Sequence, residues 1–169
     1  EVSYSATISA CEKGGQWEKA VTLLQEMHQR GVEPNEISYS AAISACAKGG
    51  QWERAVALLE EMHQRGVEPN VISFNATIQA CANAGQPAAA LQLFGQLEAA
   101  PTLDADRVSF NAILDAVCAE PARARELWKL GCSRGVFQGF ERWRAVPELD
   151  LHDLSQGAAE TAVRWWLEE

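Results

Sequence analysis

Residues 1–35 read EVSYSATISACEKGGQWEKAVTLLQEMHQRGVEPN, and residues 36–70 repeat this string with changes at only six positions. A third, more divergent copy runs over residues 71–106 and carries one extra residue near Thr102-Leu103-Asp104. A fourth, degenerate copy covers residues 107–139 and is two residues short near Ala119-Glu120-Pro121. A fixed period in the thirties predicts a stack of small units, each of which packs against its neighbours.

Each copy carries two apolar patterns of helical period. In the first copy Tyr4, Ile8 and Cys11 fall at i, i+4 and i+7, which places them on one face of a helix. Gly14-Gly15 ends that helix, and a second apolar stripe follows at Trp17, Ala20, Val21, Leu24 and Met27. Pro34 prevents a simple continuation of the second helix. The pattern predicts an all-α solenoid of about four helical hairpins.

Composition limits the kinds of function. The chain has 169 residues and a net charge of -9, which argues against a strongly basic nucleic-acid binder. It contains no apolar run of the length that a transmembrane helix needs, so we expect no membrane span. The chain opens at Glu1 inside the repeat pattern. We therefore expect a piece of a longer protein, in which any targeting segment lies upstream.

The cysteines follow the repeat. Cys11, Cys46 and Cys81 are 35 residues apart and form no close pair of the kind that binds zinc. We predict buried thiols at these positions, and neither a metal site nor a cofactor. His28 and His63 are predicted to be solvated residues at the end of the second helix of their copies.

The repeated residues resemble the pentatricopeptide repeat family, whose unit is a 35-residue helical hairpin. The resemblance rests on Val2-Ser3-Tyr4-Ser5, Gly14-Gly15, the Leu23-Leu24 pair and Gly31-Val32-Glu33-Pro34-Asn35, and it covers about residues 1–139. The Trp-x-x-Leu-Gly-x-x-Tyr opening of the competing tetratricopeptide repeat is absent. The resemblance implies a right-handed superhelical solenoid.

It also implies sequence-selective binding of single-stranded RNA, with one base read by each repeat. In that family the fifth and last residues of a repeat contact the base edge. The corresponding pairs here are Ser5 with Asn35, Ser40 with Asn70, and Asn75 with Asp106, while Asn111 is the fifth residue of the fourth copy. The resemblance suggests adenine, adenine and uracil for the three pairs, hence an A-A-U stretch.

Two further sets of residues would support the RNA. The second residues of the repeats would pack against the bases, and these are Val2, Ile37, Ile72 and Val108. Lys13 and Lys48 would contact phosphate, although Asn83 and Ala119 replace them in the later copies. The fifth residues are each followed by alanine, which predicts an exposed and uncrowded stripe along the first helices.

Each set has a structural alternative. The last residues of the repeats are favoured N-cap types and could serve only as helix caps. Lys13 and Lys48 could serve only to complement helix dipoles. Residues 1–106 carry six basic and thirteen acidic side chains, a net charge of -7, so counterion release would contribute little to RNA affinity.

The character of the chain changes at residue 140. Leu149-Asp150-Leu151-His152 alternates like a strand, and Ser155 is a plausible N-cap for a helix that includes Ala158 and Ala162. Residues 140–169 look like the incomplete beginning of a small MutS-related domain, whose Leu-Asp-x-His motif the tetrapeptide matches. Some members of that family cut nucleic acid, which makes Asp150 and His152 weak catalytic candidates. Most of that domain is absent here, so we do not expect cleavage by this chain.

Three functions therefore stay open. The first is an RNA-binding solenoid in organelle RNA processing or stability, located in the chloroplast or mitochondrion, a setting that only the resemblance implies. The second is a protein-interaction scaffold, which the acidity and the degenerate copies favour. The third is the RNA-targeting part of a nuclease.

Overall fold

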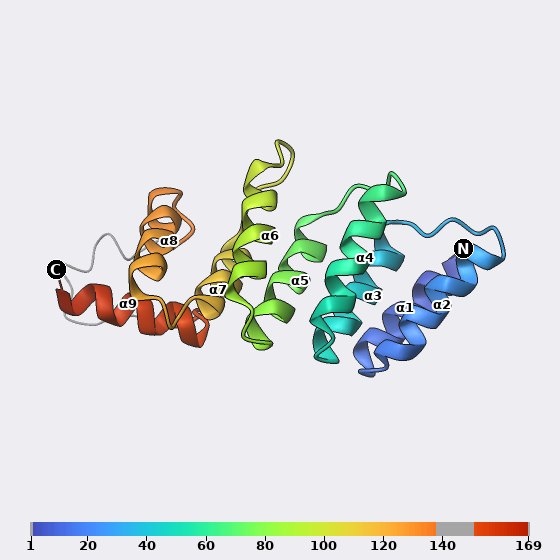
Figure 1. The fold of residues 1–169 in the computed structure, drawn as a ribbon, viewed down its shortest axis with the longest axis horizontal. Coiled ribbons are helices and arrows are strands. Elements are labelled where there is room, and N and C mark those ends of the chain that lie inside the picture. The colour runs from blue at the N-terminus through green and yellow to red at the C-terminus, as the bar shows by residue number, and fades with distance from the viewer. Residues whose placement is uncertain (1, 138–150, 169) are drawn as a thin grey trace.

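The computed structural model describes residues 2–137 and 151–168, which form nine α-helices in an elongated array (Figure 1). The first helices of the repeats are α1 (Val2–Lys13), α3 (Glu36–Lys48), α5 (Val71–Asn83) and α7 (Arg107–Ala116). The second helices are α2 (Trp17–Gln29), α4 (Trp52–Gln64), α6 (Pro87–Ala99) and α8 (Pro121–Ser133), and α9 (Gln156–Glu168) follows. The predicted all-α solenoid is confirmed for the described residues.

Glycine sets the turns that follow α2 and α4. Gly31, which follows α2, has a φ of 68°, a left-handed conformation that side chains with a Cβ rarely adopt. The next residue, Val32, donates its backbone N–H to the carbonyl of Met27 at 2.9 Å, which closes the helix end. Gly66 after α4 repeats this geometry with a φ of 74°. The connection from α6 to α7, residues 100–106, is one residue longer than those at 30–35 and 65–70, as the third copy predicts.

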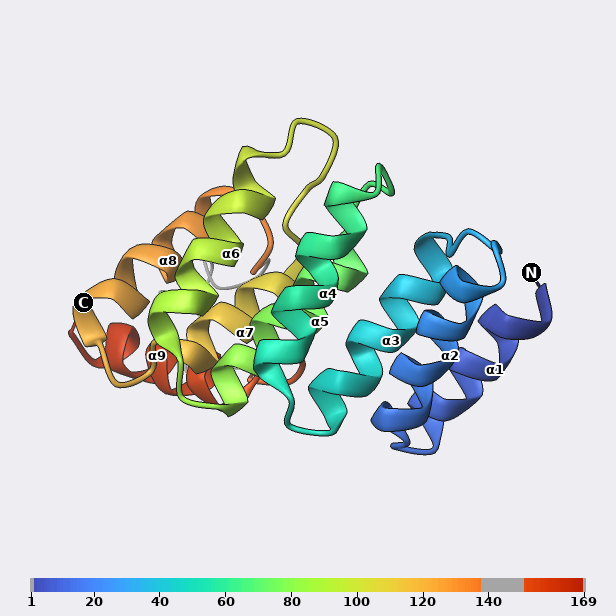
Figure 2. The same cartoon turned by 45° about the vertical axis from the view of Figure 1, so that its right-hand side comes forward.

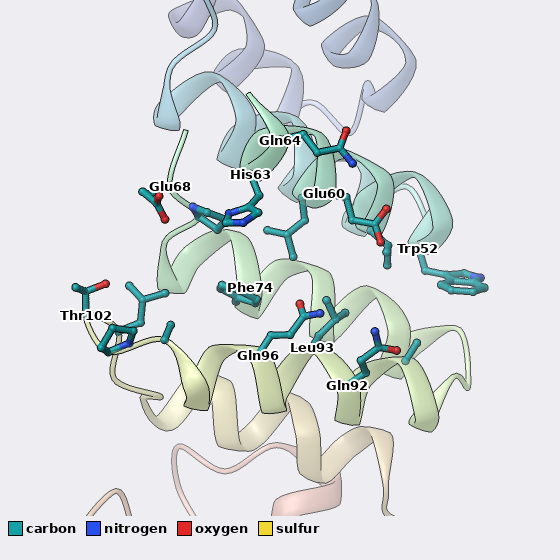
Figure 3. Close-up of a pocket in the computed structure, with 17 residues that line it drawn as sticks. Trp52, Glu60, His63, Gln64, Glu68, Phe74, Gln92, Leu93, Gln96 and Thr102 are labelled. Atoms are coloured by element: carbon teal, nitrogen blue, oxygen red, sulfur yellow. The ribbon is translucent and has the colours of Figure 1, made fainter. Parts of the chain in front are cut away.

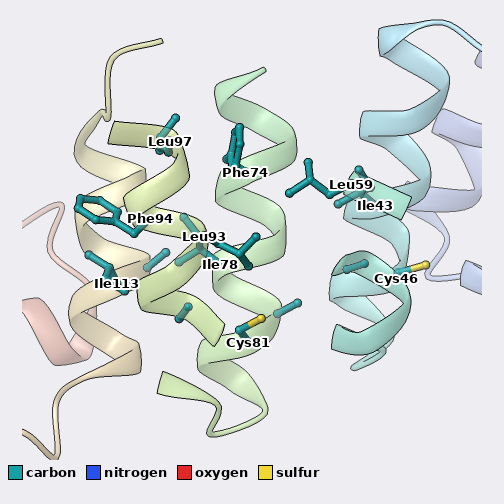
Figure 4. Packing of buried hydrophobic residues seen from close by; sticks show 14 of the residues in the cluster. Ile43, Cys46, Leu59, Phe74, Ile78, Cys81, Leu93, Phe94, Leu97 and Ile113 are labelled. Carbon is teal, nitrogen blue, oxygen red and sulfur yellow. The ribbon is translucent and has the colours of Figure 1, made fainter. Parts of the chain in front are cut away.

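Successive first helices pack side by side, and α2, α4 and α6 each contact the first helices of their own and the next repeat (Figure 2). Equivalent apolar residues fill these contacts: Ile8, Ile43, Ile78 and Leu114 all have 0% exposure. Cys11, Cys46 and Cys81 are buried free thiols, as predicted, and Cys46 and Cys81 lie among the core side chains in Figure 4. Burial raises the pKa of the Cys46 thiol to about 11.

The C-terminal end of the array is closed by aromatic packing and by α9. Trp128 of α8 stacks on Phe137 with ring centroids 4.4 Å apart, and Phe137 meets the edge of Phe110. Helix α9 packs against α7 and α8, and its axis runs across theirs in Figure 1. A Cβ on Gly157 would lie 2.6 Å from the carbonyl oxygen of Leu114, so α9 approaches α7 closely only because this residue is glycine.

The strand predicted over Leu149–His152 is not found in the described part of that segment. Leu149 and Asp150 lie outside the described residues, and His152 and Asp153 form a turn. Asp153 has a φ of 67°, which is incompatible with an extended strand. The helix predicted after Ser155 is confirmed as α9, and the Ser155 hydroxyl accepts the N–H of Ala158 at 3.3 Å near its start. No helix among the described residues is long and apolar enough to cross a bilayer.

Candidate nucleic-acid interface

The last residue of each of the first three repeats caps the first helix of the next. Asn35, Asn70 and Asp106 have extended backbones, and their side-chain oxygens accept the N–H of the residue three positions later at 3.0, 2.8 and 2.9 Å. These bonds satisfy backbone donors that the helix itself leaves unpaired. The capping role that the sequence offered as an alternative is therefore real.

The structure brings the fifth residue of a repeat to the last residue of the same repeat at two junctions. The Ser40 hydroxyl donates to Asn70 Oδ1 at 3.4 Å, and Asn75 Nδ2 donates to Asp106 Oδ1 at 3.1 Å. In the first repeat the Ser5 hydroxyl instead lies 2.8 Å from the hydroxyl of Ser38, which itself donates to Asn35. Each predicted pair is thus joined directly or through one hydroxyl.

The predicted exposure of the fifth residues is wrong. Ser5, Ser40 and Asn75 are only 7 to 8% exposed, because each faces the next repeat at the junction rather than the solvent. Asn111 is half-buried, and its Nδ2 donates to the backbone carbonyl of Asp153 at 2.9 Å. The Oδ1 atom of Asn111 is buried without a hydrogen-bond partner among the described residues.

The exposed stripe is formed by the second residues. Ile37, Ile72 and Val108 are 61%, 63% and 58% exposed, which is unusual for side chains of this size. They recur at the same position of α3, α5 and α7, which pack side by side, so they form a ladder with one apolar rung per repeat. The side chain of Val2 lies outside the described residues.

A third set of polar residues was missed from the sequence. Ser38, Ser73 and Ser109 are fully buried beneath the pairs, and the Ser109 hydroxyl lies 2.6 Å from Asn75 Oδ1 and 3.0 Å from Asp106 Oδ1. At α5 and α7 the same serine also accepts the N–H of the cap residue, which completes a capping box. Serine stands at the third position of every copy, so this signal was present in the repeat alignment.

The two lysines differ in their surroundings. Lys13 is exposed at the end of α1, whereas Lys48 Nζ lies 2.9 Å from Glu12 Oε1 of the preceding repeat. In the third repeat Asn83 accepts a hydrogen bond from Gln79, and in the fourth Ala119 is exposed. At this position of the repeat, positive charge is therefore present only in the first two copies, and Glu12 pairs with one of the two lysines.

The remaining candidates do not form a catalytic or metal site in the described part of the chain. No group of three His, Cys, Asp or Glu side chains there could hold a metal ion. His152 is exposed, and Asp150 lies outside the described residues. The prediction that His28 is solvated is wrong, because its side chain is only 17% exposed and lies between Tyr39 and Glu61.

The geometry is that of a solenoid of paired helices with a repeated cap, polar pair and apolar rung at every junction. The sequence matches the PPR repeat family at residues 1–48 and 41–83, and a single PPR repeat at residues 72–100. The chain therefore belongs to the pentatricopeptide repeat family. Comparison with curated proteins gave no match.

Solved structures share the fold. The structure of PPR10 from maize is 24% identical with a TM-score of 0.65 over 98% of this chain, and PPR10 in complex with an 18-nucleotide psaJ RNA element is 18% identical with a TM-score of 0.70 over 97%. The PPR domain of Arabidopsis thaliana protein-only RNase P 1, in complex with tRNA, is 13% identical with a TM-score of 0.65 over 98%. This chain spans 23% and 22% of the two PPR10 chains and 79% of the RNase P chain.

Proposed function

We propose that this chain binds single-stranded RNA along its first helices, with one base at each repeat. The observation that carries the proposal is the ladder of exposed apolar side chains at Ile37, Ile72 and Val108. Each rung adjoins a junction where a polar pair is held in place by a helix cap. The structurally similar PPR10 and RNase P domain were both solved with RNA, which supports the same use of the fold here.

The chemistry of the ladder fits nucleobases. The flat faces of bases are apolar and sequence-independent, so a regularly spaced aliphatic side chain can pack against each one. The edges of bases carry hydrogen-bond donors and acceptors, which the amide or carboxylate at the end of each repeat can contact. Asn70 is half-buried and Asp106 is exposed, so these last residues are more accessible than the recessed Ser40 and Asn75.

The proposed base preferences follow the pairs. We assign adenine to Ser5 with Asn35 and to Ser40 with Asn70, and uracil to Asn75 with Asp106. In this assignment Ser40 and Asn75 act mainly by fixing the orientation of the last residue, to which their side chains are hydrogen-bonded, and Ser5 does so through Ser38. Lys13 and Lys48 contribute phosphate contacts on the N-terminal half only.

The net charge limits the affinity. Because residues 1–106 have a net charge of -7, few counterions are released on binding, and the contacts to bases must supply most of the free energy. About four repeats that each contribute ~1–3 kcal/mol must also overcome the entropy of association. We therefore expect weak binding that is best measured at low ionic strength.

A single exposed side chain tests the ladder. Ile72→Ser should weaken binding of a fluorescein-labelled A-A-U-containing oligonucleotide about fivefold, the equivalent of ~1 kcal/mol of base packing. Leu167→Ser is the matched control, because Leu167 is 70% exposed but lies on α9. If the two variants bind the oligonucleotide with equal affinity in fluorescence anisotropy, the ladder is not part of the RNA site.

Two further predictions depend on resemblance alone. A small MutS-related domain that begins at residue 140 rests on the Leu149-Asp150-Leu151-His152 motif. Location in the chloroplast or mitochondrion, with a role in RNA processing or stability there, rests on the family. Fluorescence microscopy of the full-length protein fused to a fluorescent tag would test the location.

A further inference from the structure

Two contacts between the first and second repeats depend on specific residues. The indole of Trp17 lies directly against the backbone of Gly49: a Cβ at that position would lie 2.3 Å from Trp17 Cδ1. Close packing at this end of the junction therefore requires glycine at residue 49.

A polar bridge joins α2 to α4 at the other end of the same junction. The hydroxyl of Tyr39 lies 3.4 Å from His28 Nε2 of α2 and donates to Glu61 Oε1 of α4 at 3.3 Å. His28 and Glu61 are themselves 3.8 Å apart. Burial and the Glu61 carboxylate raise the pKa of Tyr39, so the hydroxyl keeps the proton that it donates. Residues from three helices thus connect α2 to α4.

The corresponding residues at the next junction cannot make these contacts. Ala84 is the equivalent of Gly49, and by analogy with that position its Cβ would clash with an indole packed in the same way. Phe74 replaces Tyr39 and has no hydroxyl, and Gln96 replaces Glu61 and has no charge. The contact of an indole with glycine and the polar bridge are therefore both unavailable between the second and third repeats.

A groove of about 720 Å³ lies at this junction, between α4 and α6 (Figure 3). Trp52 lies at one end and Thr102, in the lengthened connection after α6, at the other. Phe74 of α5 lies between the two helices, and Figure 4 shows it together with Leu59 and Leu93 from the facing sides. Two of the substitutions, Phe74 and Gln96, and the lengthened connection after α6 thus line one groove.

The walls of the groove differ in charge. The α4 side carries Glu60 and, just beyond the helix, Glu68, and no lysine or arginine is found among the described residues that line the groove. The α6 side offers the amides of Gln92 and Gln96, and the sequence of α6 contains one charged residue, Glu98, which is paired with Arg134 instead. The groove is thus apolar at its base, acidic on one wall and neutral on the other.

The geometry points to a docking site for an amphipathic helix of a protein partner, with an apolar stripe and basic residues along one flank. The groove is bounded by two helices of 13 residues each, or about 20 Å, which matches three to four turns of a partner helix. Apolar residues at i, i+3, i+4 and i+7 would lie on Phe74 and Leu93, as in other helix-in-groove complexes. Lysine or arginine beside that stripe would face Glu60 and Glu68.

The acidic lining of the groove favours a basic partner helix over RNA. An RNA phosphate backbone would meet the carboxylates of Glu60 and Glu68 with no lysine or arginine in the described lining, which is unfavourable. The site belongs to the second-helix layer, whereas the ladder of Ile37, Ile72 and Val108 belongs to the first helices. The two surfaces can therefore be tested separately.

Three labelled synthetic peptides provide the probe. The first is a helical peptide of about 14 residues with leucine at i, i+3, i+4 and i+7 and lysine at the flanking positions. The second has the same composition in scrambled order, and the third has glutamate in place of lysine. We expect the first to bind the 169-residue chain about tenfold more tightly than either of the others, measured by fluorescence anisotropy.

Two matched pairs of variants locate the binding. Gln92→Arg with Gln96→Arg places two cations in the groove and should weaken the basic peptide about tenfold. Ala88→Arg with Ala99→Arg adds the same charge at exposed positions of the same helix outside the groove, and should have little effect. All four positions are exposed, and they differ only in whether they line the groove. The fold should therefore tolerate both pairs of substitutions equally.

The carboxylates are tested in the same way. Glu60→Gln with Glu68→Gln should weaken the basic peptide about fivefold and reduce its salt dependence, whereas Glu18→Gln with Glu53→Gln, which removes the same charge elsewhere, should not. The proposal is overturned if the three peptides bind alike or none binds at about 1 mM. It is also overturned if both arginine pairs act equally, or if single-stranded RNA displaces the peptide from the groove.

Discussion

The amide of Asn75 donates a hydrogen bond to the carboxylate of Asp106 at 3.1 Å, across the junction between the third and fourth repeats. The same carboxylate oxygen accepts the backbone N–H of Ser109 and so begins α7. One side chain therefore fixes the start of a helix and presents an acceptor at the proposed RNA surface. Capping and base recognition are compatible in this arrangement, and each can be measured.

The helix-cap role of Asn70 predicts a loss of stability. Asn70→Ala removes the acceptor for the Ser73 N–H, which lies 2.8 Å away, and we expect the free energy of unfolding to fall by ~1 kcal/mol. Chemical denaturation followed by circular dichroism measures the change. Asn83→Ala, at the exposed end of the same helix, should cost clearly less. Equal losses would contradict the capping role.

Gly49 should tolerate no side chain. Gly49→Ala places a Cβ 2.3 Å from Trp17 Cδ1, so the indole or the helix must move, at a cost of about 1–3 kcal/mol. Thermal unfolding measures the cost, and the fluorescence of the displaced tryptophan should change with it. Gly14→Ala is the control, because its Cβ would meet its nearest neighbour at 3.4 Å, an ordinary contact. A larger effect at Gly14 would refute the packing argument.

Burial of Cys46 predicts a loss of stability in alkali. The pKa of this thiol rises from 9.0 to about 11 on folding, so between these values the unfolded state releases a proton that the folded state retains. Stability from this group is complete below pH 9 and is lost as the pH rises toward 11. Cys46→Ala should reduce that loss by at most roughly 3 kcal/mol. If the wild-type protein and Cys46→Ala lose stability in parallel between pH 8 and 11, the raised pKa of Cys46 is not the cause of the loss.

The ion pair between Lys48 and Glu12 predicts that RNA binding can be strengthened. Glu12→Gln frees the ammonium group, now 2.9 Å from the carboxylate, for phosphate contact, and should tighten binding roughly two- to fivefold at low salt. Glu18→Gln makes the same change in net charge at an exposed position of α2. An equal gain from both variants would show that only net charge matters.

The repeat period was sufficient to predict the helical hairpins, because identical residues in successive copies must have nearly identical surroundings. Ile8, Ile43 and Ile78 and the three cysteines are buried as the period requires. The burial of the fifth residues could not be predicted from the repeat period. Ser40 and Asn75 face a neighbouring repeat, and a pattern within one helix does not show which of its sides that neighbour covers.

The groove between α4 and α6 could not be predicted from the repeat period either, because it depends on differences between the copies. Ala84, Phe74 and Gln96 are unremarkable singly, and only the contacts of Gly49, Tyr39 and Glu61 show what their replacement removes. The turn at Asp153 likewise depends on distant partners. Its carboxylate is 3.2 Å from Arg107 and its carbonyl accepts from Asn111, contacts that alternation of leucine and polar residues cannot reveal.

We propose above that the polar pair at each junction selects the base at that repeat. The most direct test exchanges one pair: Asn75→Ser with Asp106→Asn gives the third repeat the pair of the second and keeps a good N-cap. Affinities are measured for oligonucleotides that differ only at the base facing the third repeat. We expect the preference to move from uracil to adenine by about fivefold, the worth of one net hydrogen bond. An unchanged preference in the exchanged protein would contradict it.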